Sequence, residues 1–177
     1  MTEPESAAFR RIMGHLPTGV TVVATAHLGG GVCGLTANAF TSVSLTPPLV
    51  LVCVDRASNT YGCMLAKGSF AASFLASDQH WLSVRFAERR DDKFDGVPYS
   101  LGVTGSPILQ GSVGHVECEI QDEHEGGDHS IFVCRVVAAE PGDGAPLVFF
   151  RGSYTTVARA VEGIEPLPGE PEDEPER

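Results

Sequence analysis

The chain opens with a short amphipathic helix followed by a hairpin. Over residues 6–16 the apolar side chains recur every three or four positions, as on one face of an α-helix, and Pro17 ends the pattern. Residues 19–28 are rich in β-branched side chains and run into three consecutive glycines, which is typical of a strand and a tight turn. A second strand is therefore expected to return beside the first.

Strands and short helices alternate in the middle of the chain. Residues 49–55 (LVLVCVD) are apolar at consecutive positions, which predicts a strand buried on both faces. A short helix follows, with Ser58 or Asn59 as its N-terminal cap and Gly68 at its end. Residues 69–76 then predict a further strand.

A second helix is predicted after this strand, with Ser77 or Asp78 at its cap. Its helical spacing is carried by Trp81, Leu82, Arg85 and Phe86. Three strands close the pattern, over residues 112–125, 128–140 and 146–157, and the first of them alternates two sets of side chains between its faces. In that strand Val113, His115, Glu117, Glu119 and Gln121 are opposed to Gly114, Val116, Cys118 and Ile120.

These elements predict a mainly β (α+β) fold. About seven strands connected largely by hairpins, with three short helices, indicate an antiparallel barrel or sandwich with helices over its ends. The glycine-rich stretch LGGGVCG lacks the G-x-G-x-x-G spacing and leads into a strand instead of a helix. A dinucleotide-binding βαβ unit is therefore not expected.

Charge separates a body from a tail. The formal net charge is −11, and residues 162–177 hold seven acidic side chains and one arginine. A Pro/Glu-rich segment of this kind buries too little apolar area to offset its ordering entropy. We therefore expect one domain over residues 1–160 and a disordered tail over 161–177. The 12 basic residues are scattered, which argues against a nucleic-acid partner.

The composition also indicates a cytoplasmic protein with no membrane partner. Hydrophobic residues make up 42% of the chain, but no apolar run reaches the roughly 18 residues of a membrane span. The start, MTEPESAAFRR, lacks the basic and apolar regions of a signal peptide. The five cysteines form no C-x-x-C pair or metal-like spacing, and we expect them to be reduced thiols with structural roles.

Candidate chemistry is sparse. No serine occupies a G-x-S-x-G elbow, and the glycines within HEGGDH (residues 124–129) argue for a turn there and against a metal site. What stands out is GLTANAFTSVSLTPPLVLVCVD (residues 34–55), where small polar side chains lie between apolar runs. Such a pattern suits a site in which a bound cofactor reacts and the protein supplies hydrogen bonds. A flavin fits, because its ring edge needs polar partners and its phosphate needs donors from a helix N-terminus.

The same residues resemble the short-chain flavin reductases of the FMN-binding split-barrel type. The resemblance extends from Phe9 to Val157, and its most specific pieces are the stretch 34–55, SNTY, RFAERRDDKF and GDHSIFVCRV. It implies an antiparallel split barrel and a homodimer with FMN or FAD in a groove near the subunit interface. NADH or NADPH would bind on the exposed face of the flavin ring, and a flavin-dependent monooxygenase would receive the reduced flavin.

The resemblance also implies roles for particular residues. The flavin ring edge would be lined by Thr36, Ala37, Asn38, Ser42, Val43 and Ser44. The ribityl chain would lie along Cys53, Val54 and Asp55. Ser58, Asn59 and Thr60 would be phosphate-side ligands, and the phosphate or adenylate side would be completed by Phe86, Ala87, Arg90 and Lys93. His129 would position the nicotinamide, with Tyr154 near the same groove.

Ordinary structural roles stand beside these. Threonine, serine and valine are common strand residues, and Ser58 serves equally as a helix cap. Arg90 and Lys93 lie in the charged run ERRDDK, which is also typical of a solvated surface.

Three functions therefore remain open. The leading prediction is an NAD(P)H:flavin oxidoreductase that releases reduced flavin to a monooxygenase. The others are a reductase of another small acceptor with fixed FMN, and a flavin- or haem-binding split barrel without turnover.

Overall fold

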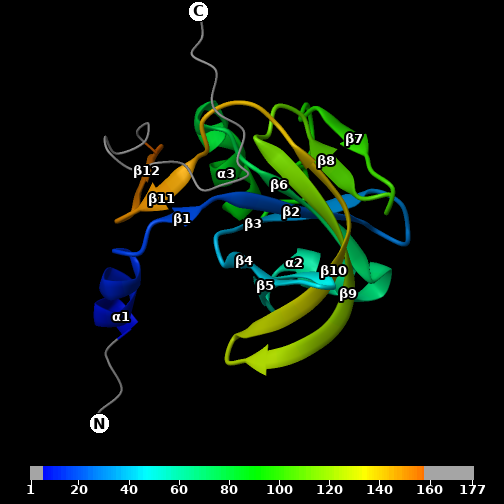
Figure 1. Ribbon diagram of the computed structural model, residues 1–177, viewed down its shortest axis with the longest axis horizontal. Helices are drawn as coiled ribbons and strands as arrows, with labels where there is room; N and C mark the ends of the chain where they lie inside the picture. Colours follow the sequence, from blue (N-terminus) through cyan, green and yellow to red (C-terminus); the bar gives the residue numbers. More distant parts are fainter. Residues whose placement is uncertain (1–5, 158–177) are drawn as a thin grey trace, which may run out of the picture.

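The computed structural model of the chain describes residues 6–157 (Figure 1). Its helices are α1 (Ser6–Met13), α2 (Asn59–Lys67), the 3-10 turn η1 (Ser77–Gln79) and α3 (His80–Ala87). Its strands are β1 (Thr18–Gly19), β2 (Thr21–Ala26), β3 (Val32–Ala37), β4 (Phe40–Leu45), β5 (Pro48–Asp55), β6 (Ser69–Phe74), β7 (Tyr99–Leu101), β8 (Pro107–Leu109), β9 (Gly114–Gly126), β10 (His129–Pro141), β11 (Val148–Phe150) and β12 (Ser153–Thr155). The predicted mainly β fold is confirmed.

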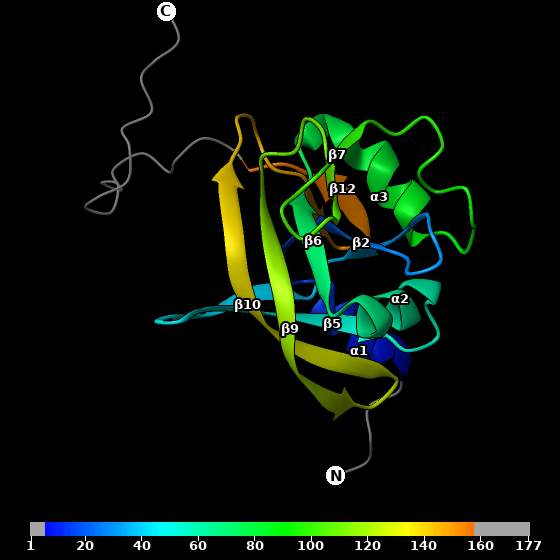
Figure 2. The same cartoon turned by 90° about the vertical axis from the view of Figure 1, so that its right-hand side faces the viewer.

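A long hairpin joins the two halves of the main sheet. Seven antiparallel strands lie in the order β3-β2-β6-β9-β10-β5-β4. In this sheet β9 pairs with β6, and the first half of β10 pairs with β5. Register shifts after Val133 and Val136 bend the hairpin, as Figure 2 shows. The sheet curls until β3, at one edge, contacts β5 near the other. The predicted antiparallel split barrel is therefore confirmed.

Helix α2 begins and ends where the sequence predicts. Ser58 is the N-cap, and its Oγ accepts a hydrogen bond from the Thr60 amide at 3.2 Å. Gly68 ends the helix with a left-handed φ of 71°, and its amide donates to the Met64 carbonyl. Because Cys63 and Met64 are buried, the helix is fixed on the barrel and its N-terminus has a defined position.

Two apolar clusters form the core. One fills the barrel and includes Met64, Phe70 and Phe132. The other lies between the sheet and α3 and includes Leu82 and Phe86. Each side chain of this size contributes roughly 2 kcal/mol when fully buried. The second cluster fixes the end of α3, and therefore the start of the loop that follows it.

Strand β5 is less buried than predicted. Val50, Val52 and Val54 point into the core and are at most 6% exposed, but Leu49 and Leu51 on the opposite face are half-buried. The prediction of two buried faces is wrong because the rest of the described chain covers the second face only partly. A run of apolar residues does not distinguish these two environments.

Two further predictions are corrected. Residues 146–157 form the hairpin β11–β12 and not one strand, because Arg151 and Gly152 adopt positive φ values of 51° and 80° in a tight turn. Neither Ser77 nor Asp78 caps α3. The chain makes the turn η1 first, where Gln79 Oε1 accepts the Ala76 amide at 3.0 Å.

The cysteines also differ from the prediction of five free thiols. Cys33 of β3 and Cys63 of α2 are joined by a disulfide, with their Cα atoms 6.5 Å apart. Cys53, Cys118 and Cys134 are free, and burial raises the pKa of Cys134 to about 12. The correction arises because the barrel brings together two cysteines that are 30 residues apart in sequence.

No helix in residues 6–157 has both the length and the apolar character needed to cross a membrane. The predicted tail over residues 161–177 lies outside the described residues.

Candidate functional site

A cleft of about 390 Å³ opens between α2, the end of α3 and one side of the barrel. Its walls are residues 32–39, Cys53, Asp55, residues 57–60, residues 86–91, Lys93 and His129. These segments are distant in sequence, and the curled sheet brings them together. The volume lies in the range of small-molecule binding sites.

Most of the predicted site residues meet at this cleft. Those that line it are Thr36, Ala37, Asn38, Cys53, Asp55, Ser58, Asn59, Thr60, Phe86, Ala87, Arg90, Lys93 and His129. Five do not line it: Ser42, Val43, Ser44, Val54 and Tyr154. The first three lie on the edge strand β4, Val54 is fully buried in the core, and Tyr154 lies on β12.

The N-terminus of α2 lies at the cleft. The Asp55 carboxylate accepts the Ala57 amide at 2.8 Å, and Ser58 caps the helix, so the turn before α2 has a fixed path. The first amides of a helix have no partners within it, and the helix dipole adds partial positive charge. The Ala57, Ser58 and Thr60 amides already donate to Asp55 and to the Ser58 hydroxyl. This end of α2 therefore offers a phosphate group the Asn59 amide, the side chains of residues 58–60 and the helix dipole.

Strand β3 is linked to α3 by hydroxyl groups. Thr36 Oγ1 donates to the Ser83 carbonyl at 2.7 Å. Ser83 Oγ in turn shares a hydrogen bond of 2.9 Å with the Tyr154 hydroxyl. The Thr36 hydroxyl hydrogen is therefore engaged, and this group can only accept a hydrogen bond from a ligand. Tyr154 stabilises the wall from behind.

His129 stands at the start of β10, opposite Asp55 of β5. Its Nδ1 lies 2.7 Å from Asp128 Oδ1, and this hydrogen bond holds the pKa of Asp128 below its ordinary value. The contact orients the imidazole and leaves Nε2 available to a ligand. The Arg56 guanidinium supports the same turn through the His129 carbonyl, at 3.4 Å.

Gly34 is a cleft-lining residue that the sequence did not identify as a site residue. It lines the cleft, and a Cβ atom there would lie 2.7 Å from a ring carbon of Phe86. Its carbonyl accepts the Lys93 ammonium at 3.0 Å. Glycine within a strand often marks such a close approach, so the glycine at position 34 was the signal in the sequence that could have identified this residue.

The donor set fits a flavin nucleotide. Backbone and side-chain polar groups of β3 and the turn after it face one part of the cleft, and the α2 N-terminus faces another. The first can meet the carbonyl and N–H groups of a flavin ring, and the second can meet its phosphate.

Comparison with known proteins agrees with this fit. The family profile described as "Flavin reductase like domain" matches residues 13–158. The reductase subunit HsaB of a flavin-dependent monooxygenase from Rhodococcus jostii is 38% identical over 89% of this chain and 77% of its own. An NADH-dependent FAD reductase from Streptomyces globisporus is 44% identical over 73% of each chain.

Solved structures give the same result. The NADH:FAD oxidoreductase SgcE6 of Streptomyces globisporus C-1027, in complex with NAD and FAD fragments, superposes with a TM-score of 0.83 at 39% identity. The match covers 88% of this chain and 94% of that one.

Proposed function

The chain belongs to the flavin reductase like domain family, and we propose that it reduces FAD or FMN with NADH and releases the reduced flavin to a partner monooxygenase. The observation that carries this proposal is the single cleft region in which polar groups of β3, the α2 N-terminus and His129 meet. Its relatives include reductase subunits of flavin-dependent monooxygenases and an NADH-dependent FAD reductase.

The residues of the cleft bind and orient the two ligands. When bound, a flavin would supply the hydride acceptor and a reduced nicotinamide would supply the hydride. Asn38 and the amides after Ala37 can hold the polar ring edge, while residues 57–60 hold the phosphate. His129 is placed to position the nicotinamide. Hydride transfer depends on this orientation more than on a strong acid or base, which agrees with the scarcity of such groups in the sequence.

Steady-state kinetics test this function. The rate of NADH oxidation is measured while riboflavin, FMN or FAD is added in turn. We expect the rate to rise with flavin concentration and to saturate, because the flavin is a diffusible substrate. The proposal is wrong if neither NADH nor NADPH is oxidised with any of the three flavins.

We further propose that the protein is a homodimer. Phe9 and Ile12 on α1 and Leu16 just after it are all more than half exposed, and Leu45 on the edge strand β4 is 91% exposed. Exposed apolar side chains of this size on a folded chain are typical of an interface, and we take α1 with Leu16 and the end of β4 as the proposed contact surface. Strand β4 also carries Ser42, Val43 and Ser44, which are predicted flavin-site residues. In a homodimer through β4, groups of the second copy would lie close to these three residues.

Light scattering is expected to give the mass of two chains, and the double replacement Ile12→Ser with Leu45→Ser should shift the protein toward the monomer. Leu101→Ser is the control, because Leu101 is also exposed but lies on β7, outside this surface. A wild-type mass of one chain contradicts the dimer.

A further inference from the structure

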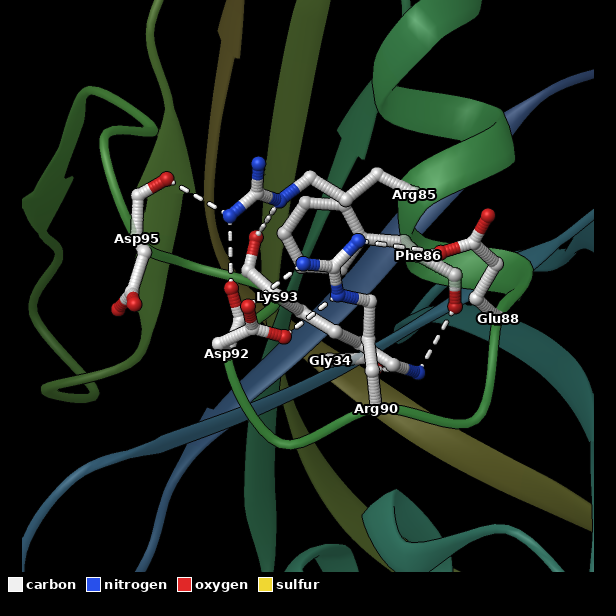
Figure 3. A network of polar contacts seen from close by, with 8 residues as sticks. All are labelled: Gly34, Arg85, Phe86, Glu88, Arg90, Asp92, Lys93 and Asp95. Carbon is white, nitrogen blue, oxygen red and sulfur yellow. Dashed lines mark hydrogen bonds and ion pairs between the residues drawn. The ribbon is translucent and has the colours of Figure 1, made fainter.

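The loop after α3 has a fixed path along one wall of the cleft. Arg85 Nε donates to the Lys93 carbonyl at 2.5 Å, and its Nη2 donates to the carbonyls of Asp92 and Asp95 at 2.7 Å each (Figure 3). All three acceptors are main-chain groups. Arg85 therefore holds the backbone of the loop and leaves its carboxylates available for other contacts.

Lys93 fastens the same loop to the barrel. Its Nζ donates to the Gly34 carbonyl at 3.0 Å and to the Phe86 carbonyl at 2.9 Å. The side chain is half-buried, and burial lowers the pKa of its ammonium group. Two of the three N–H groups are thus committed to the protein, which leaves at most one for a ligand.

Arg90 is held by two carboxylates of this fixed loop. Its Nε and Nη2 donate to the two carboxylate oxygens of Asp92 at 2.5 Å each, and its Nη1 donates to Glu88 Oε2 at 3.2 Å (Figure 3). The guanidinium lowers the pKa of Asp92 to about 2, so the pair is ionised at any pH near neutrality. The group formed by Glu88, Arg90 and Asp92 carries a net charge of −1, and within it Glu88 and Arg90 line the cleft while Asp92 lies behind them.

The position of Arg90 makes this pairing relevant to binding. Arg90 and Glu88 both line the cleft. The other lysine and arginine side chains that line it are Arg89 and Lys93, and Lys93 already donates two hydrogen bonds to the protein. A guanidinium binds phosphate with the same two-pronged geometry that it uses here for Asp92. A phosphate group of a ligand that approaches Arg90 must therefore compete with Asp92 and is repelled by its charge.

We propose that Asp92 and Glu88 are specificity-determining residues, which hold Arg90 and thereby limit how strongly the cleft binds phosphate groups on its nucleotide ligands. This inference rests on the proposed function. The phosphate has two possible sources: the phosphate end of FMN or FAD, and the 2′-phosphate that distinguishes NADPH from NADH. Both present the same chemistry to Arg90.

Calorimetric binding tests the inference without relying on turnover. Dissociation constants of riboflavin, FMN and FAD are measured for the wild type, Asp92→Asn and Glu88→Gln, and those of NAD⁺ and NADP⁺ are measured with flavin bound. If the flavin phosphate is the source, we expect Asp92→Asn to tighten FMN and FAD about three- to tenfold and to leave riboflavin unchanged. If the 2′-phosphate is the source, the dissociation constant of NADP⁺ should fall by a similar factor and that of NAD⁺ should not change. Glu88→Gln should act in the same direction with a smaller effect, because it shares only one hydrogen bond with Arg90.

Two further variants separate this mechanism from a general change in charge. Asp91→Asn removes a cleft-lining carboxylate of the same loop that makes no bond to Arg90 among the described residues. Adding Arg90→Ala to Asp92→Asn should abolish the gain. The inference is overturned if Asp92→Asn leaves the affinities for FMN and FAD unchanged relative to riboflavin and the affinity for NADP⁺ unchanged relative to NAD⁺. It is also overturned if Asp91→Asn raises the affinity for the phosphate-bearing ligand equally, or if the increase in affinity persists after Arg90 is replaced. A wild-type protein that binds no flavin contradicts the proposed function instead.

Discussion

Replacing Glu117 with glutamine is expected to lower the free energy of unfolding by about 3 kcal/mol and the melting temperature by roughly 10 °C. Glu117 of β9 is only 2% exposed, and its carboxylate accepts the Val103 amide at 2.9 Å and both the amide and hydroxyl of Thr104 at 2.7 Å. A glutamine keeps one acceptor oxygen but replaces the other with an NH2 group. This group is a donor, and it would face the N–H and O–H donors of Val103 and Thr104. Thermal and denaturant unfolding measure the loss.

The loss should also depend on pH. Burial raises the pKa of Glu117, but the hydrogen bonds from Thr104 and Val103 outweigh it and hold the pKa below its ordinary value of 4.5. Because the folded-state pKa is lowered, the carboxylate stabilises the protein above the pKa of the unfolded chain and ceases to do so as pH falls through the folded value. The difference between wild type and Glu117→Gln should therefore be full at pH 7 and shrink below about pH 4.5.

Glu119→Gln provides the control for both effects. Glu119 lies two residues further along β9 and is exposed, with a surface contact to Arg135 at 2.5 Å. A surface ion pair of this kind contributes about 1 kcal/mol at most. Equal losses in the two variants would show that the buried carboxylate has no special role.

His129→Ala is expected to raise the Michaelis constant for NADH or to slow flavin reduction, by roughly tenfold, with little change in the dissociation constant of the flavin. The side chain lines the cleft with its orientation set by Asp128, and it can position the nicotinamide without contacting the phosphate side. Stopped-flow reduction and flavin titration separate the two steps.

His124→Ala is the matched control, since His124 lies in the same hairpin but does not line the cleft. Normal kinetics in His129→Ala would remove this residue from the site. A loss of flavin binding instead would mean that it holds the flavin and not the nicotinamide.

Local signals in the sequence were sufficient where one or two residues decide the geometry. Ser58 and Gly68 mark the ends of α2 because a cap and a left-handed glycine act within one turn of the helix. The strands β7 and β8 were not predicted, since each has only three residues and too few positions to show a period.

Contacts between residues that are distant in the sequence could not be predicted from the sequence patterns. Alternation along β9 grouped Glu117 with His115, Glu119 and Gln121 but gave no sign that it is buried, because the loop between β7 and β8 folds over it and supplies three donors. The close approach of Phe86 to Gly34 likewise depends on the packing of α3 against the barrel. The charged run ERRDDK indicated a solvated surface or a phosphate site, and its internal pairing at Arg90 needed coordinates.

Anaerobic reduction of free flavin tests whether the protein uses the flavin as a diffusible substrate. A trace of the protein is mixed with a large molar excess of FAD and a larger excess of NADH, without oxygen, and the visible absorbance of oxidised flavin is followed. If the flavin is a diffusible substrate of the cleft, all of the FAD should be bleached over many turnovers. Bleaching that stops at one flavin per protein chain would contradict this account, because the flavin would then be a fixed group that is not released.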